Sequence, residues 1–124
     1  MRSGYQRKRI VAMTLAAAVA VGFVAYALEW REDRSIPPGP PEVAGRLLME
    51  KRKCLRCHKV DGYGGLVGPD LTAVATRIKE PRMDAVLTDP KSVDEKAKMP
   101  KPRLTDEQRA VIVAYLRTLH GLPH

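Results

Sequence analysis

The sequence predicts an all-α fold: a small helical domain carried behind one membrane-spanning helix. Three observations predict this class. An uncharged run of nineteen residues lies near the N-terminus, a strongly capped amphipathic segment lies near the C-terminus, and no run alternates apolar and polar residues as a strand would. The 124 residues suffice for one domain plus an extension. Many of the apolar residues lie in the N-terminal run, so we expect a thin core that depends on a covalent or metal staple.

The first 28 residues are typical of a membrane segment. Residues 1–9 form a basic tip, and residues 10–28 carry no charge. As a helix the uncharged run spans about 28 Å at 1.5 Å per residue, close to the hydrocarbon thickness of about 30 Å. The positive-inside rule places the basic tip in the cytoplasm and exports the rest of the chain. The basic residues of the tip are Arg2, Arg7, Lys8 and Arg9.

A retained transmembrane anchor is favoured over a cleaved signal peptide for residues 10–28. The tripeptide Ala25-Tyr26-Ala27 matches a small-x-small cleavage site. However, the apolar run is long, and no polar stretch separates it from Ala27. Tyr26 and Trp30 also lie where an interfacial belt of aromatic residues is expected.

Residues 29–41 predict a linker. A charged stretch leads into Pro37-Pro38-Gly39-Pro40-Pro41, a composition that favours a semi-rigid extended chain. We expect this linker to act as a spacer between the membrane and a domain at residues 42–124.

The first helix of that domain is expected to begin at Pro41, because proline is favoured at the first helical position. Glu42 complements the helix dipole in the first turn. Val43, Leu47 and Leu48 are predicted to form the inner face.

Glycine, proline and apolar spacing divide the middle of the domain. A glycine-rich loop is expected over residues 61–69 and a short helix over 70–77. A second helix over 81–89 ends at Pro90, and a loop follows over 91–104. The predicted inner residues of the second helix are Met83, Val86 and Leu87.

The last helix has the clearest boundaries. Thr105 is a favourable N-cap with Gln108 three residues on, the spacing of a capping box. Asp106 and Glu107 complement the helix dipole. The predicted apolar stripe is Val111, Ile112, Ala114, Tyr115, Leu116 and Leu119, and the residues expected to close the helix are Gly121 and Pro123.

Both cysteines of the chain lie in the run Cys54-Leu55-Arg56-Cys57-His58. This C-x-x-C-H pattern is the attachment signature of a c-type haem. The thiols of Cys54 and Cys57 would add across the two porphyrin vinyl groups, and His58 would supply an axial nitrogen to the iron. The motif therefore predicts one covalent haem c, which would also be the staple that the thin core requires.

Two other kinds of site use the same residue types. A structural zinc site needs four ligands, and the nearest second pair, His120 and His124, lies about sixty residues downstream. A thioredoxin-like redox pair needs a βαβ context, and no strand run is available to build one. A chance occurrence without a role is the third alternative, and haem attachment is the favoured interpretation.

Further residues extend the pattern in a fixed order: Gly45, the C-x-x-C-H run, Gly68-Pro69-Asp70-Leu71, Met99-Pro100 and Tyr115-Leu116. With this set, residues 42–122 resemble a class I (monohaem) cytochrome c of the membrane-anchored bacterial type. The resemblance implies that the first and last helices of the domain cross with Gly45 facing Tyr115. It also implies that the Pro69 carbonyl accepts a hydrogen bond from His58, which would orient the imidazole.

Met99 is the predicted second axial ligand. It lies in a loop before Pro100, which restricts the preceding backbone, and the resemblance points to the same residue. Of the other methionines, Met1 and Met13 lie in the membrane-targeting part of the chain. Met49 is too close in sequence to the haem motif, and Met83 lies on the inner face of a predicted helix. Because His58 and Met99 would fill both axial positions, electron transfer is favoured over catalysis, and no small-molecule substrate is expected.

The charge of the chain is +8, but four of these charges lie in the basic tip. The exported part is only mildly basic, and nothing in it resembles a nucleic-acid-binding arm. Its basic residues crowd the haem motif and the Met99 loop, which predicts docking onto an acidic face of a redox partner. They are Lys51, Arg52, Lys53, Arg56 and Lys59, and Lys96, Lys98, Lys101 and Arg103. The alternative is a solvated surface, because Glu50, Asp94 and Glu95 dilute the pattern.

Together these observations predict a non-enzymatic one-electron carrier. It would be a single-pass protein of the bacterial inner membrane, with its N-terminus inside and its haem domain in the periplasm, where c-type haem is attached. A dedicated cytochrome subunit of a larger respiratory or photosynthetic membrane complex is the main alternative, and a cleaved soluble shuttle is another. A haem gas sensor or small peroxidase would require a vacant or labile sixth position at the iron.

Overall fold

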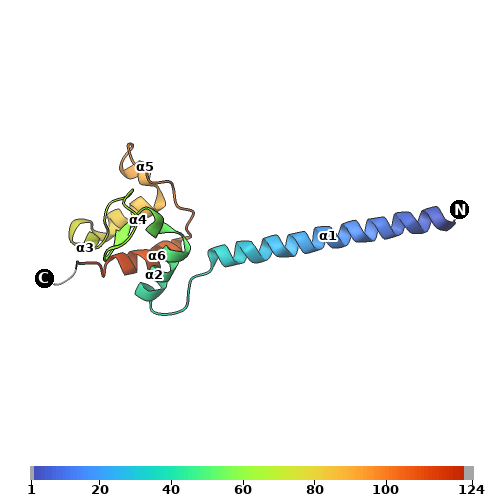
Figure 1. Ribbon diagram of the computed structural model, residues 1–124, viewed down its shortest axis with the longest axis horizontal. Coiled ribbons are helices and arrows are strands. Elements are labelled where there is room, and N and C mark those ends of the chain that lie inside the picture. Colours follow the sequence, from blue (N-terminus) through green and yellow to red (C-terminus); the bar gives the residue numbers. More distant parts are fainter. Residues whose placement is uncertain (1, 122–124) are drawn as a thin grey trace. The chain divides into compact units, whose positions relative to one another are not determined.

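The computed structural model describes residues 2–121 and divides the chain into two compact units that meet between Ser35 and Ile36 (Figure 1). The first unit is one helix, α1 (Arg2–Arg34). The described chain is mostly helical, which confirms the predicted all-α class.

Helix α1 is longer than the predicted span of residues 10–28. Residues 29–34, expected to be the first part of an extended linker, continue the helix. The reason is local: these residues include no proline or glycine, and Arg34 stacks on the ring of Trp30 one turn earlier, with 4.1 Å between the guanidinium carbon and the ring centroid. The helix ends where Ser35 donates a hydrogen bond to the Glu32 carbonyl at 2.7 Å. Its stretch Gly4–Arg34 has a mean hydropathy of 2.2 in its most apolar window, so it is long and apolar enough to cross a membrane.

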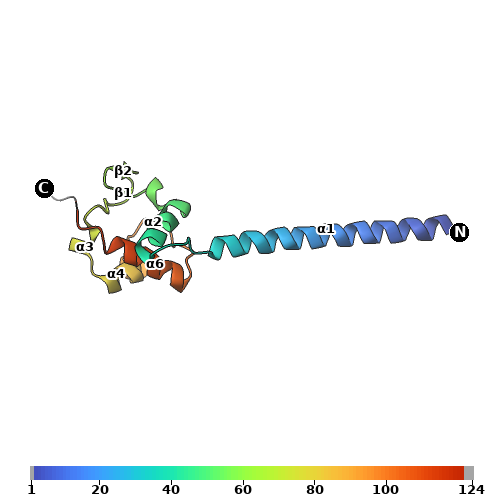
Figure 2. The same ribbon diagram turned by 90° about the horizontal axis from the view of Figure 1, so that it is seen from below.

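The second unit is built around two helices that lie side by side, α2 (Pro41–Lys51) and α6 (Asp106–Leu116) (Figure 2). Helix α2 begins at Pro41, as predicted. A Cβ on Gly45 would lie 1.9 Å from the Val111 carbonyl oxygen and 2.8 Å from Cβ of Tyr115. The absence of a side chain at Gly45 therefore allows the close crossing, and the expected contact between Gly45 and Tyr115 is present.

The predicted inner face of α2 was wrong in part. Leu48 is buried as expected, but Val43 and Leu47 are 46% and 41% exposed. The buried residues of the helix are Ala44, Gly45, Leu48 and Met49. Small residues at positions 44 and 45 let α6 approach, and this contact, rather than the count of large apolar residues, sets the rotation of α2 about its axis.

The N-terminus of α6 confirms the predicted capping box. The Gln108 backbone N–H donates to Thr105 Oγ1 at 3.2 Å, and the Thr105 backbone N–H donates to Gln108 Oε1 at 3.1 Å. Gln108 is fully buried, so this polar side chain is satisfied inside the core. Val113 is buried too, although it was not in the predicted stripe. Gly121 follows at a positive φ of 90°, and Pro123 lies outside the described residues.

Short elements connect the two long helices of the second unit. In chain order they are a 3-10 turn η1 (Cys54–Arg56), strands β1 (Lys59–Val60) and β2 (Tyr63–Gly64), and helices α3 (Val74–Arg77), α4 (Glu80–Thr88) and α5 (Pro90–Val93). The antiparallel pair β1–β2 was not predicted, because two residues per strand are too few to show an alternating pattern. Its turn, Asp61-Gly62, has positive φ at both residues, as such a tight turn requires.

Two further boundaries differ from the prediction. Helix α3 occupies only the last half of the expected span 70–77, because the Asp70 side chain accepts the Thr72 backbone N–H and forms a turn instead. Residues 90–93 form α5 where a loop was expected from residue 91; Asp89 caps it by accepting the Lys91 N–H at 3.2 Å. In α4, Met83 and Leu87 are buried as predicted, whereas Val86 is half-buried.

Candidate functional site

An apolar cleft with a cavity volume of about 80 Å³ lies among core residues of the second unit. Its walls come from α2, α3, α4 and α6, from the haem motif and from the loop before α6. The lining residues are Met49, Cys54, His58, Leu71, Val74, Ile78, Met83, Val86, Leu87, Met99, Ile112 and Leu116. The cleft thus joins one thiol, one imidazole and three thioethers in a wall that is otherwise hydrocarbon.

Three of the predicted site residues, Cys54, His58 and Met99, line this cleft. Cys57 is exposed and is not among the lining residues. Pro69 is also outside the lining, but its carbonyl oxygen lies 2.9 Å from Nδ1 of His58. The structure therefore brings Cys54, His58 and Met99 to one cavity, whereas Cys57 and Pro69 are not among its lining residues.

A tight turn presents the haem motif to the cleft. Lys53, which lies between α2 and η1, adopts a left-handed backbone conformation with φ 59°. The backbone N–H of His58 then donates to the Cys54 carbonyl at 3.0 Å. This turn leaves Cys54 partly buried, and burial raises the pKa of its thiol.

The imidazole of His58 is held from two sides. With the Pro69 carbonyl accepting from Nδ1–H, the other ring nitrogen, Nε2, is the one that can bind a metal. A Cβ on Gly68 would lie 2.6 Å from Cε1 and 2.7 Å from Nδ1 of the ring. Gly68 therefore has to be a glycine for the ring to take this position.

The glycine-rich segment packs directly against the backbone of the haem motif, a contact that sequence reasoning missed. A Cβ on Gly65 would lie 2.1 Å from the Arg56 carbonyl oxygen, and the Gly65 N–H donates to the Leu55 carbonyl at 2.9 Å. The close spacing of glycines directly after the motif is the signal that could have indicated this contact.

Three methionines reach the cleft, and their settings differ. Met49 and Met83 are 2% and 4% exposed and belong to α2 and α4. Met49 was expected to lie too close to the motif to take part, yet it also lines the cavity. Met99 is only partly buried and lies in a segment outside any helix or strand.

The residues present fit a covalent haem better than the zinc alternative. The cleft offers an apolar wall for a flat macrocycle, a thiol, a fixed imidazole and thioethers, which are soft ligands suited to iron in haem. Over residues 2–121, no three His, Cys, Asp or Glu side chains gather as a metal-binding cluster. His124 of the proposed zinc pair lies outside that range.

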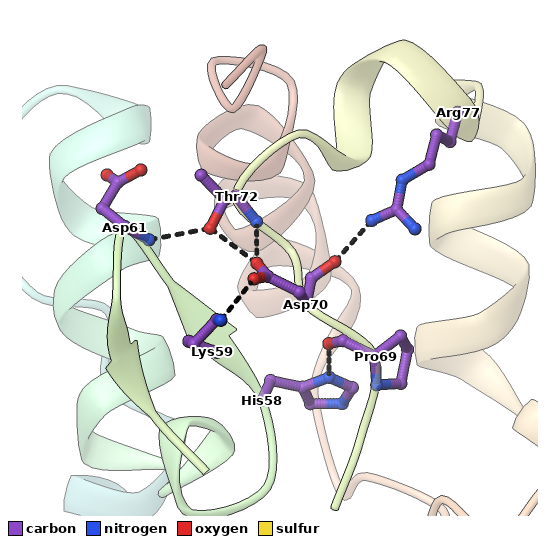
Figure 3. A network of polar contacts seen from close by, with 7 residues as sticks. All are labelled: His58, Lys59, Asp61, Pro69, Asp70, Thr72 and Arg77. Carbon is purple, nitrogen blue, oxygen red and sulfur yellow. Dashed lines mark hydrogen bonds and ion pairs between the residues drawn. The ribbon is translucent and has the colours of Figure 1, made fainter. Parts of the chain in front are cut away.

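Polar contacts around Asp70 flank the His58–Pro69 pair, and sequence reasoning did not single them out (Figure 3). The Asp70 carboxylate accepts the Thr72 N–H at 2.8 Å and the Thr72 hydroxyl at 2.6 Å, and it pairs with Lys59 Nζ at 3.0 Å. These contacts, those from Thr72 above all, lower the pKa of Asp70 to about 2. The side chain of Arg77 donates to the Asp70 carbonyl oxygen.

Several basic residues predicted for docking are engaged within the domain. Arg52 donates to Gln108 Oε1 at 3.0 Å. Lys59 pairs with Asp70 at 3.0 Å, and Lys101 pairs with Asp89 at 3.1 Å. Other members of the two basic groups have exposed side chains; they are Lys51, Lys53, Arg56, Lys96, Lys98 and Arg103.

Comparisons with known proteins place this geometry in context. The family model described as "Cytochrome c" matches residues 42–120. The C subunit of nitric oxide reductase from Cereibacter sphaeroides is 27% identical over 84 residues, which is 60% of this chain and 57% of that relative. The chain therefore spans less than two thirds of that protein. The crystal structure of SoxXA from P. pantotrophus is similar with a TM-score of 0.57 and 23% identity, over 68% of this chain and 84% of the SoxXA chain, a likeness that shows the fold alone.

Proposed function

The chain belongs to the cytochrome c family, and from this premise we propose that it carries single electrons on one haem c tethered to a membrane. Members of this family transfer electrons through a covalent c-type haem and are not enzymes by themselves. In our proposal Cys54 and Cys57 would attach the haem, and His58 and Met99 would bind its iron. When bound, the haem iron supplies the chemistry by alternating between its ferrous and ferric states.

The observation that carries the proposal is the placement of Cys54, His58 and Met99 on one apolar cleft, with the His58 ring already oriented. An imidazole fixed through Nδ1 presents Nε2 to a metal without further rearrangement. With haem bound, the apolar wall would exclude water from the iron, and together with His/Met ligation this would favour a raised reduction potential.

Met99 is favoured over the other two methionines because of its backbone. Met49 and Met83 are buried within helices that pack on the core. Met99 precedes Pro100 in an irregular segment that can adjust to bring sulfur to iron. Met99 also packs against the core cluster, so its side chain already faces inward.

The test compares Met99→Ala with the matched variant Met83→Ala in the haem-loaded protein. Met99→Ala should lose the sulfur-to-iron absorption band of the oxidised protein, lower the reduction potential and admit carbon monoxide to the reduced iron. Met83→Ala should lose stability, by about 2–5 kcal/mol for a buried methionine, but retain the band. If the wild-type protein binds carbon monoxide readily, the sixth position is labile and a gas sensor or peroxidase becomes the better interpretation.

We also propose that α1 stays in the membrane with its basic tip in the cytoplasm and that the haem domain lies in the periplasm. The length and hydropathy of α1 support a membrane span, and the charges before it support this orientation. Cysteine accessibility on either side of bacterial inner-membrane vesicles measures the orientation: a residue near position 4 should react only from the cytoplasmic side.

A dedicated subunit of a larger membrane complex is the second candidate. It is favoured by the similarity to the C subunit of nitric oxide reductase, although this chain covers only 57% of that protein. A native gel of source membranes in mild detergent, stained for haem, separates the two. Migration within a large complex supports a resident subunit, and migration alone supports a tethered carrier.

The proposed docking face includes exposed residues on both sides of Cys57 in the sequence. Exposed Lys53 and Arg56 precede Cys57, and three strongly exposed apolar side chains follow it, Tyr63, Leu66 and Val67 at 80%, 82% and 86%. An apolar centre with a charged rim is typical of protein interfaces. We expect an acidic redox partner, so its electron-transfer rate should fall with salt, and Lys53→Glu together with Arg56→Glu should slow it further.

A further inference from the structure

The contact between His58 and Pro69 has a second link beside it. Lys59 directly follows His58, Asp70 directly follows Pro69, and these two neighbours form an ion pair at 3.0 Å. Backbone hydrogen bonds tie the same two segments: Gly68 N–H donates to the Cys57 carbonyl and Leu71 N–H to the Lys59 carbonyl, both at 2.8 Å. The segment that offers the Pro69 carbonyl is therefore held against the haem motif from both ends.

We name the side chains of Lys59, Asp70 and Thr72 the Asp70 clamp (Figure 3). Thr72 gives the clamp its rigidity, since both its N–H and its hydroxyl donate to the Asp70 carboxylate. The Thr72 oxygen in turn accepts the Asp61 N–H at 2.9 Å, which joins the clamp to the turn of the β1–β2 pair. Because the pKa of Asp70 is lowered to about 2, its carboxylate stays charged at physiological pH.

We propose that the Asp70 clamp is a positioning device that sets how strongly the Pro69 carbonyl accepts the His58 Nδ1–H, and thereby tunes the reduction potential. The inference rests on the proposed function, since a potential exists only with haem bound. It concerns residues that do not touch the iron, so these are positioning residues and not ligands.

The direction of the effect follows from the chemistry of the imidazole. A strong hydrogen bond from Nδ1–H makes the ring more basic and a better donor to the metal. A better donor favours the oxidised iron, so a loosened clamp should raise the potential. For the removal of Lys59, the Coulomb interaction alone makes the opposite prediction. Loss of a nearby positive charge favours the oxidised iron and should lower the potential.

Two variants in the full-length, haem-loaded protein test the inference. Thr72→Val removes the hydroxyl without a change of charge, and Lys59→Gln removes the cation. Both should raise the midpoint potential in a redox titration. Both should also shift the His58 ring N–H resonance of the reduced protein toward the position of a weaker hydrogen bond. Thr72→Ser, which keeps the hydroxyl, should leave the midpoint potential and the ring N–H resonance at their wild-type values.

The control is an exposed ion pair away from the clamp, Arg117 with Glu80 at 3.1 Å; Arg117→Gln should leave the potential and the ring N–H signal unchanged. A fall in potential for Lys59→Gln, or no shift in Thr72→Val, would overturn the inference. If Lys59→Gln fails to load haem, Thr72→Val decides alone. If either of these results is obtained while the wild-type protein binds haem, the proposed function stands and only the inference is refuted. If the wild-type protein binds no haem, both the proposed function and the inference are refuted.

Discussion

The substitution Gly45→Ala tests the close crossing of α2 and α6. A Cβ at this position would lie 1.9 Å from the Val111 carbonyl oxygen, whereas ordinary contacts begin at 3.4 Å. The two nearest obstructing atoms are the backbone O and C of Val111, and the third is Cβ of Tyr115, so no side-chain rotation relieves the clash. Helices α2 and α6 would have to move apart by about 1.5 Å, the difference between those two distances.

Two opposing terms set the magnitude. Overpacking costs roughly 1–3 kcal/mol, and a backbone obstacle favours the upper end, about 3 kcal/mol. Alanine in place of glycine within a helix contributes about 1 kcal/mol in the other direction. The net loss in the free energy of unfolding is therefore about 2 kcal/mol, which lowers Tm by roughly 8–16 °C in a domain of this size.

Thermal unfolding of the haem-loaded protein, followed by the haem absorbance, reports on the second unit alone. Gly22→Ala is the matched control, because it lies in α1 and a Cβ there meets nothing within 4 Å; it should leave this transition unchanged. A Tm for Gly45→Ala equal to or above that of the wild type would refute the close crossing of α2 and α6.

Three further substitutions probe the site and its support. Gly68→Ala should displace the His58 ring, whose Cε1 atom would otherwise lie 2.6 Å from the new Cβ; ring resonances at the wild-type positions in the NMR spectrum of the reduced protein would contradict this. Asp70→Asn should change how the free energy of unfolding depends on pH in the acid range. The folded pKa of about 2 lies below the ordinary 3.8, so the contribution of Asp70 is complete above pH 3.8 and is lost as the pH falls toward 2. Urea unfolding of the two proteins should therefore differ at pH 5 and converge near pH 2, and a constant difference would argue against it. Thr105→Ala should remove the acceptor of the Gln108 N–H and lower the free energy of unfolding by about 1 kcal/mol, measured against Thr118→Ala, whose hydroxyl donates only to the Tyr115 carbonyl at the end of α6.

Local signals predicted well wherever the deciding residues are close in sequence. The capping box of Thr105 and Gln108 joins residues three apart, and Pro41 needs only its own fixed φ to begin α2. The haem motif is equally local, since its five residues are consecutive. Such features form from nearby groups and do not depend on how distant segments pack.

Other features depended on contacts between distant segments. The small residues of α2 decide which face packs against α6, and Val43 and Leu47 are left exposed as a result. Three methionines line the cleft although the sequence distinguished them mainly by position along the chain. Asp70 and Lys59 are eleven residues apart and form an ion pair only because two backbone hydrogen bonds bring their segments together.

The sequence by itself determined the helical class, the haem attachment motif, the membrane segment and the cap of the last helix, because each follows from covalent neighbours or from hydrophobic length. Only the tertiary structure decided which side chains line the cleft and how His58 is oriented. It also decided that the Lys59–Asp70 ion pair lies beside the hydrogen bond between His58 and the Pro69 carbonyl. These properties require segments distant in sequence to be within hydrogen-bond distance, and the spacing of residues along a chain does not specify that distance.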